Sequence, residues 1–398
     1  MNTLLTHVGR LFTSGQPVSQ DVDVLLGAGS ILAVGRSGTL APTADAETVD
    51  CQGALLTAGL VDAHTHPLYG HPRLAEIEER SAGAGYAQIA ARGGGILATV
   101  RDTRLESWDA LESGLRDRLH RWLHWGTTTV EAKTGYWLEQ QGELHAVRLL
   151  RELSHVAHLP DLVVTFLGAH ALPGEFVGRR REFIAEVAGW SRAAHREGAR
   201  FADVFCDEGA FTVGEARQLL RSAREAGLEL RVHADELALT GGTRLAVELG
   251  ARSADHLLRI GAAEVAVLAR SGTVATLCPI TALTLGRTPP ARELLAAGVP
   301  VALGSDHNPG TSGSTSMSLV VWLATTEMGL SVEEALTAAT DGGARSLGLP
   351  DRGQVVAGKR ADLVLWNTEH EGGFAWNPEL RPLKVWRAGT VLPHYDAH

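Results

Sequence analysis

The chain has 398 residues, and 36 Lys and Arg against 46 Asp and Glu give it a net charge of −10. This length suits one (β/α)8 barrel of about 250 residues with a smaller accessory domain. An acidic chain without a basic run argues against nucleic acid or an anionic membrane as a partner, and no apolar run approaches the roughly 18 residues that span a bilayer. Three scattered cysteines and an N-terminus without a signal-peptide pattern predict a cytoplasmic protein.

The two ends of the chain differ from its middle. Residues 1–54 and 352–398 are rich in short strand and turn signals, and neither segment is large enough to form a good core alone. We therefore expect them to pair into one small composite β-domain, a β-sandwich made from both termini. Residues 55–351 are expected to form the barrel domain.

Within the middle segment, apolar runs that end in polar residues alternate with amphipathic helical stretches. Capping boxes at Thr212 and Ser331 predict the starts of two of these helices. Eight strand–helix units favour an α/β fold in which a parallel sheet closes into a (β/α)8 TIM-like barrel. The expected strands are Leu55–His66, Thr127–Lys133, Leu162–His170, Phe201–Asp207, Leu228–His233, Ser253–His256, Thr273–Pro279 and Pro300–Asp306.

Several strand-end residues suit a metal. His64 and His66 end the first apolar run, and residues i and i+2 of a strand face the same side. His233 and Asp306 end two later runs, at the rim where barrel enzymes carry their catalytic residues. Each residue taken alone is more often a hydrogen-bonded rim residue. Together, three imidazoles and one carboxylate suit Zn²⁺ or iron with a position left for water.

Two further residues suit acid–base chemistry beside such a metal. Glu236 follows His233 by three residues, and His256 ends the next strand. A carboxylate and a spare imidazole next to an activated water fit general acid–base catalysis. Two alternatives stay open at this point: Glu236 as an acid that offsets a helix dipole, and His256 as a residue that orients a metal ligand.

A set of collinear motifs between about residues 50 and 365 resembles the imidazolonepropionase family of the amidohydrolase superfamily. The motifs are VDAHTH, GGGILATVRDTR, TTTVEAKTGY, TFLGAHALP, FADVFCDEGAFT, VHADE, SADHL and SDHNPGTS. The resemblance implies the amidohydrolase type of barrel and hydrolysis of the cyclic amide of 4-imidazolone-5-propanoate to N-formimidoyl-L-glutamate, in histidine degradation. It also implies a homodimer.

The resemblance further implies the roles of individual residues. One Zn²⁺ or Fe²⁺/Fe³⁺ per chain would be bound by His64, His66, His233 and Asp306. Catalysis would fall to Glu236, His256 and Asp306. The small-molecule substrate would be bound by Arg73, Tyr86, Tyr136, His170, Glu236, Asn308, Gly310 and Thr311.

The sequence departs from the family pattern in two places. Where an aromatic-Gly-Gly-Ser-Arg stretch is usual, the chain reads Tyr69-Gly-His-Pro-Arg73, and Pro72 restricts the backbone before Arg73. His307 stands where an aromatic residue is common. Extra polar contacts near the metal from His71 and His307 are therefore a further expectation.

Two other functions compete with this interpretation. An aromatic or formimidoyl deaminase of the same superfamily would use the same metal, His256 and Glu236, but Arg73 and Tyr136 suit a carboxylate tail better than a purine. A non-catalytic barrel with a structural metal would need no spare acid or base. The presence of both Glu236 and His256 argues against it.

Overall fold

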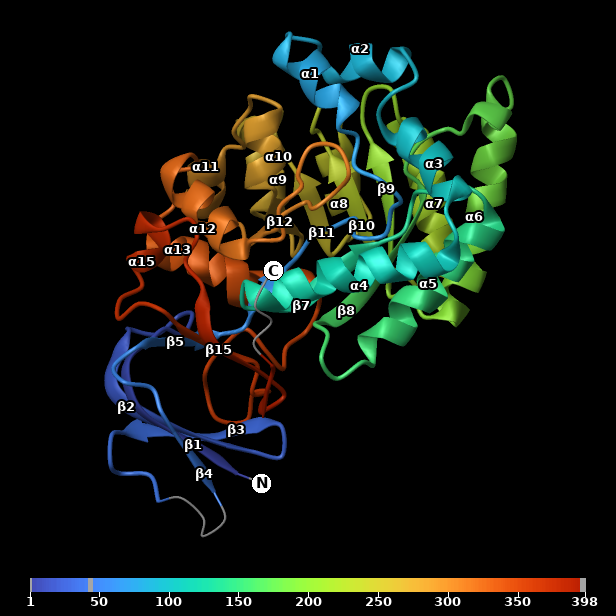
Figure 1. Cartoon of the computed structure of the whole chain (residues 1–398). Coiled ribbons are helices and arrows are strands. Elements are labelled where there is room, and N and C mark those ends of the chain that lie inside the picture. The colour runs from blue at the N-terminus through green and yellow to red at the C-terminus, as the bar shows by residue number, and fades with distance from the viewer. Residues whose placement is uncertain (1, 42–45, 394–398) are drawn as a thin grey trace.

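The structure is a computed structural model that describes residues 2–41 and 46–393, apart from the side chains at positions 86 and 87. It consists of a barrel and a separate sheet built from both ends of the chain, which lies beside one end of the barrel (Figure 1). The expected α/β fold, a barrel with a smaller unit formed by both termini, is confirmed.

The barrel contains eight parallel strands that are hydrogen-bonded in chain order. The ring closes where Ala63 N donates to Leu303 O at 3.2 Å and Thr65 forms a parallel bridge with His307. The carboxyl ends of all eight strands therefore meet at one rim. The strands are β6 (Leu60–Asp62), β7 (Thr127–Lys133), β8 (Asp161–Ala169), β9 (Phe201–Cys206), β10 (Glu229–Ala234), β11 (Ser253–His256), β12 (Val274–Leu277) and β13 (Val301–Leu303).

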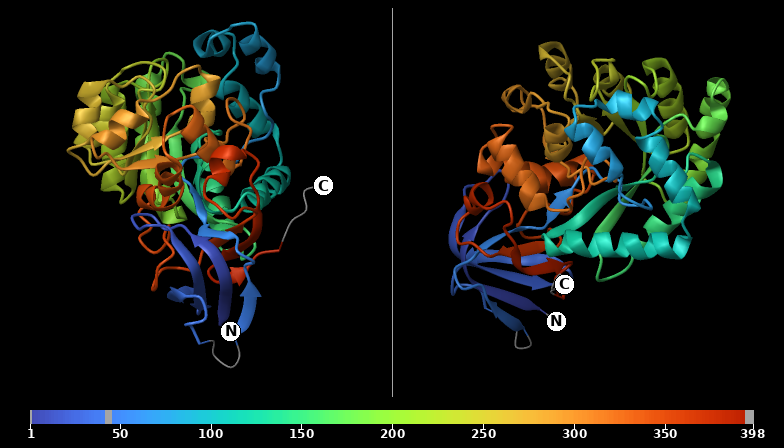
Figure 2. Two further views of the ribbon diagram at one scale, coloured as in Figure 1. Left: turned by 90° about the vertical axis from the view of Figure 1, so that its left-hand side faces the viewer. Right: turned by 45° about the horizontal axis from the view of Figure 1, so that its top comes forward.

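Helices surround the barrel strands, and the short α1 and α2 project beyond the rim (Figure 2). The capping boxes expected at Thr212 and Ser331 are present and begin α7 and α13. The helices are α1 (Ala75–Ser81), α2 (Tyr86–Ala91), α3 (Ile96–Leu105), α4 (Trp108–His124), α5 (Gln140–Ser154), α6 (Arg180–Glu197), α7 (Val213–Glu225), α8 (Gly242–Glu248), α9 (Ala262–Leu268), α10 (Pro279–Thr284), α11 (Ala291–Ala296), α12 (Met317–Thr326), α13 (Val332–Thr337), α14 (Gly343–Ser346) and α15 (Gly373–Trp376), with single turns at Gly174–Phe176 and Ala338–Gly342.

The terminal strands form one hydrogen-bonded sheet. Strand β1 pairs with β4 through its first half and with β5 through its second half. The sheet has its own apolar core, which includes Leu5, Val24 and Trp386. Its strands are β1 (Thr3–Leu11), β2 (Ser19–Gly27), β3 (Ser30–Arg36), β4 (Glu47–Asp50), β5 (Leu55–Ala58), β14 (Leu363–Trp366), β15 (Pro382–Arg387) and β16 (Thr390–Val391).

The expected strand Leu55–His66 is wrong, because the chain changes sheets within it. β5 pairs with β1 and β14 of the terminal sheet, whereas β6 begins the barrel. The break falls at Gly59, where a Cβ would lie 2.2 Å from Thr128 Oγ1. Both halves are buried, so hydrophobicity does not mark the change. The terminal sheet thus extends past residue 54, and parts of the expected small domain, 42–45 and 394–398, lie outside the described residues.

The other seven expected barrel strands correspond to β7–β13, with ends that differ by up to three residues. Among the described residues, no helix combines the length and apolarity that a bilayer crossing requires.

Candidate active site

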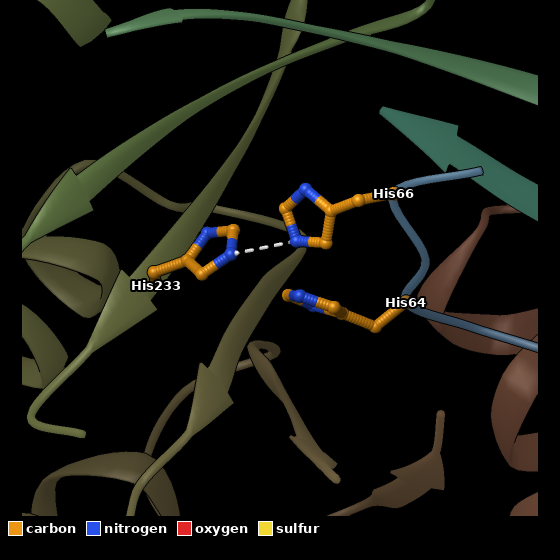
Figure 3. A group of neighbouring side chains, drawn as sticks. All are labelled: His64, His66 and His233. Atoms are coloured by element: carbon orange, nitrogen blue, oxygen red, sulfur yellow. Dashed lines mark hydrogen bonds between the residues drawn. The ribbon is translucent and has the colours of Figure 1, made fainter. Parts of the chain in front are cut away.

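Three histidines converge at the rim of the barrel. His64 and His66 follow β6, and His233 lies in β10. All three are buried. The His66 and His233 Nε2 atoms lie 3.3 Å apart, and the His64 and His233 ring centroids are 4.5 Å apart. Figure 3 shows the three rings turned toward one another from two sides of the barrel.

Asp306 lies beside this cluster in the segment after β13. Its Oδ1 is 3.6 Å from His64 Nε2 and 3.5 Å from His66 Nε2. Its Oδ2 accepts a hydrogen bond from Thr281 Oγ1 at 2.5 Å. Burial raises the pKa of Asp306 to about 6. A nearby cation would favour the ionised carboxylate.

The donor set fits a metal ion. The buried Nε2 atom of His64 has no hydrogen-bond partner, and burial holds the pKa of His64 and His66 well below the ordinary histidine value. Both rings are therefore neutral at physiological pH, the form in which imidazole binds metals. One ligand atom from each of His64, His66 and His233 lies within 4.8 Å of the others.

Buried charges below the rim support His233. Its Nδ1 lies 3.0 Å from Asp203 Oδ2. Lys133 Nζ donates to Asp203 at 2.8 Å and to Glu131 at 2.9 Å. Burial by itself would raise the pKa of the Asp203 carboxyl. The neighbouring His233 and Lys133 outweigh burial and hold that pKa well below its usual range. The Asp203 carboxylate therefore faces the Nδ1 side of the His233 ring, while Nε2 lies toward the cluster.

His64 is oriented in the same manner. Its Nδ1 lies 2.7 Å from Asp255 Oδ2, and Arg231 donates to the same oxygen at 3.1 Å. All three side chains are buried. Sequence reasoning missed the residues of this layer. These residues could have been found from charged residues at alternate positions of one predicted strand, such as Glu131 and Lys133.

Glu236 and His256 lie together, as the acid–base hypothesis requires. Glu236 Oε1 is 3.5 Å from His256 Nδ1. Burial, reinforced by the charges of Asp306 and Asp207, raises the pKa of Glu236 well above its ordinary value. Asp207, which sequence reasoning did not single out, accepts the Glu236 backbone N–H at 2.6 Å. It thereby holds the turn that carries Glu236.

Arg73 is buried and lines one cavity together with His66, His233 and Asp306. Its Nε donates to Glu76 at 3.1 Å and one terminal nitrogen donates to Thr99 Oγ1 at 2.7 Å. Glu76 in turn accepts the Gly95 N–H at 2.6 Å, at the GGGI motif. Despite the preceding proline, the guanidinium is therefore held in one orientation.

The loop after Asp306 is organised by Asn308. Its side-chain oxygen accepts the N–H groups of Gly310 and Thr311, each at 2.8 Å. Its amide nitrogen donates to Asp306 O at 2.6 Å and to Thr311 Oγ1 at 2.8 Å. Asn308 thus shapes the segment between Asp306 and Thr311, next to the histidine cluster.

His170 and Tyr136 form the opposite wall. The His170 ring stacks on His66 with centroids 5.1 Å apart, and its Nδ1 donates to Gly135 O at 3.1 Å. Burial lowers the pKa of His170 to about 3. The Tyr136 ring lies 5.2 Å from His170. Tyr86 begins α2, and its side chain lies outside the described residues.

One cavity joins most of the expected site residues. Four apolar residues that sequence reasoning did not name, Ile96, Phe205, Leu237 and Leu285, complete its wall. His64 and Gly310 are not part of the lining. The expected residues that line it are His66, Arg73, Tyr136, His170, His233, Glu236, His256, Asp306, Asn308 and Thr311.

The two unusual histidines do not line this cavity. His71 is exposed and pairs with Glu106 at 2.8 Å. His307 is buried, with its Nε2 3.1 Å from the Tyr69 hydroxyl and its ring against Trp122. Neither adds the polar contact to the histidine cluster that the departures from the family pattern suggested.

Known proteins match this chain along most of its length. Residues 55–392 match the amidohydrolase family. Imidazolonepropionase from Anaeromyxobacter dehalogenans is 42% identical over 352 residues, 87% of this chain and 84% of that protein. The chain belongs to the imidazolonepropionase family of amidohydrolases. A second member, from Bacillus cytotoxicus, is 37% identical and covers 98% of this chain and 96% of its own.

A solved structure supports the fold assignment. An adenosine deaminase from Xanthomonas campestris with bound zinc superposes with a TM-score of 0.69 at 20% identity, covering 98% of this chain and 92% of its own. At this identity the likeness concerns the fold alone. Membership of the amidohydrolase family and the histidine cluster together indicate a metal centre.

Proposed function

We propose that the protein hydrolyses the cyclic amide of 4-imidazolone-5-propanoate to N-formimidoyl-L-glutamate. As a member of its family, the chain is a hydrolase that acts on C–N bonds. The observation that carries the choice of substrate is a single cavity lined by both the histidine–aspartate cluster and the Arg73 guanidinium. A small ring with one carboxylate tail has the matching pair of features.

His64, His66, His233 and Asp306 would hold one metal ion per chain, Zn²⁺ or Fe²⁺/Fe³⁺. Such an ion, when bound, supplies a Lewis acid and lowers the pKa of water to about 7. The carboxylates of Asp203 and Asp255 hold two of the imidazoles with their Nε2 atoms directed to the ion site.

Three residues would move protons in the reaction. One water adds to the ring carbonyl carbon, and Asp306 or His256 accepts its proton. The bond between that carbon and the ring nitrogen then breaks, and Glu236 gives a proton to the nitrogen. Glu236 lines the cavity, and its Oε1 lies 3.5 Å from His256 Nδ1. A proton can therefore pass between these two side chains after only a small movement of either one. The water oxygen stays in the new carboxylate.

Arg73 would bind the propanoate. A guanidinium offers paired donors that match a carboxylate, and the contacts to Glu76 and Thr99 hold it ready. Tyr136, His170 and Thr311 line the same cavity as Arg73 and the histidine cluster, and the ring would lie there. The roles of Tyr86, Asn308 and Gly310 in substrate binding also remain proposals.

The direct test is incubation of the purified protein with imidazolone propanoate while the ring absorbance is followed. We expect the absorbance to disappear with formation of N-formimidoyl-L-glutamate and without ammonia release. Ammonia release from an aromatic or formimidoyl substrate, with imidazolone propanoate left intact, would instead favour the deaminase alternative.

The homodimer and the cytoplasmic location remain predictions. Mass measurement of the protein in solution tests the first of them, because a dimer has twice the mass of the 42.2 kDa chain.

A further inference from the structure

A cysteine lies next to His64, at the edge of the histidine cluster. Cys278 directly follows β12 and precedes α10. Its sulfur, one nitrogen of His64 and one nitrogen of His256 lie within 4.8 Å of one another. All three residues are at most 2% exposed. The family-derived ligand set does not include this thiol.

The two histidines of this second group, His64 and His256, have ring nitrogens without a hydrogen-bond partner. Both ring nitrogens of His256 are buried without a hydrogen-bond partner, and so is Nε2 of His64. Asp255 already occupies Nδ1 of His64 at 2.7 Å, which leaves Nε2 for a ligand. Buried unpaired nitrogens are costly unless a ligand satisfies them. The two nitrogens of His256, which the first ligand set does not use, thus point to a bound group.

The surroundings favour a cation. The carboxylates of Asp306, Asp255 and Glu236 lie near enough to Cys278 to interact with it electrostatically. The same carboxylates would attract a positive ion. A thiolate with two imidazoles is a soft donor set, which selects thiophilic ions over Mg²⁺, Ca²⁺ or Mn²⁺.

We infer that Cys278, His64 and His256 form a second metal position that binds a thiophilic divalent ion such as Cd²⁺. The ion replaces the thiol proton, which is released to solvent. Because Nε2 of His64 has one lone pair, it serves one ion at a time, and the second position competes with the proposed catalytic one. An ion there also occupies His256, so thiophilic metals would inhibit the enzyme from within the site.

The test uses the fact that the chain has three cysteines. Cys51→Ser with Cys206→Ser leaves Cys278 as the one thiol, and Cd²⁺ is titrated into this variant. We expect an ultraviolet sulfur-to-cadmium charge-transfer band that saturates at one equivalent, with proton release. Cys278→Ser in an otherwise unchanged chain should lose the band. A band of equal size in Cys278→Ser, or none in the double variant, would overturn the inference.

A measurement on the unaltered protein covers the case in which a variant fails to fold. X-ray absorption at the cadmium edge should show one sulfur neighbour at the bound ion. Only nitrogen and oxygen neighbours would refute the second position. These readouts are independent of catalysis, so failure of the proposed reaction leaves them interpretable.

Discussion

Gly310 leaves the space that the Arg73 guanidinium occupies. A Cβ built at Gly310 would lie 1.6 Å from a terminal nitrogen of Arg73 and 2.4 Å from its central carbon. The loop after β13 therefore approaches Arg73 closely because position 310 has no side chain. The family resemblance marks Gly310 as a substrate contact, whereas the geometry shows how it positions Arg73.

Gly310→Ala should displace Arg73 and weaken substrate binding. Loss of a charge-assisted hydrogen-bonded pair costs about 1.5–3 kcal/mol, so KM should rise by roughly 10- to 150-fold, with metal content unchanged. Gly313→Ala is the matched control in the same loop, since its Cβ would meet nothing within 4 Å. Equal KM values for the two variants would show that Arg73 does not bind the tail.

Arg73→Lys should raise KM clearly with a smaller change in kcat, and Arg73→Ala should be worse. Lysine keeps the charge but cannot form two parallel bonds with a carboxylate. Steady-state kinetics with imidazolone propanoate measures the effect. Turnover by Arg73→Ala at an unchanged KM would mean that the carboxylate is bound elsewhere.

Glu236→Gln should lower kcat by about 10²–10⁴-fold, the usual contribution of a positioned proton donor. Metal content should stay the same, because Glu236 is not among the proposed ligands. Glu208→Gln, at an exposed position two residues after β9, serves as the control and should keep its activity. If kcat of Glu236→Gln hardly changes, Glu236 does not transfer a proton in the reaction and is an acidic residue of the turn after β10 with no catalytic role.

Metal removal should abolish activity, and return of one ion per chain should restore it. Elemental analysis of protein purified without added metal should give a ratio near one. Asp306→Ala should lose detectable activity together with metal affinity, because it removes a ligand and a proton acceptor. Activity that survives chelation in metal-free protein would contradict the proposed centre.

Asp203→Asn should weaken metal binding by about 10- to 100-fold, the usual effect of removing a residue that orients a metal-bound histidine. The side chain keeps its size but loses the charge that faces His233 and Lys133. Competition with a chromogenic chelator measures the affinity. Asp109→Asn, on the exposed surface of α4, should bind as the unchanged protein does.

Much of the architecture could be predicted from residue patterns alone. Strand–helix alternation predicts a parallel barrel, and parallel strands place their carboxyl ends at one rim. Histidines and an aspartate that end strands far apart in the chain were therefore expected to meet. His233 and Asp306 were found by this argument because it requires only the direction of each strand.

Other features depended on the tertiary structure. Alternation along a strand tells which side a residue faces, but not which residues of other strands lie at the same height in the barrel. The pairing of Lys133 with Asp203 and of His64 with Asp255 follows from strand register and ring closure. The proximity of Cys278 to His256 has the same origin. The switch of sheets at Gly59 was hidden for a related reason, since both sheets bury apolar strands. Local sequence determined the elements and the chemistry at their ends, and long-range packing decided which groups became neighbours.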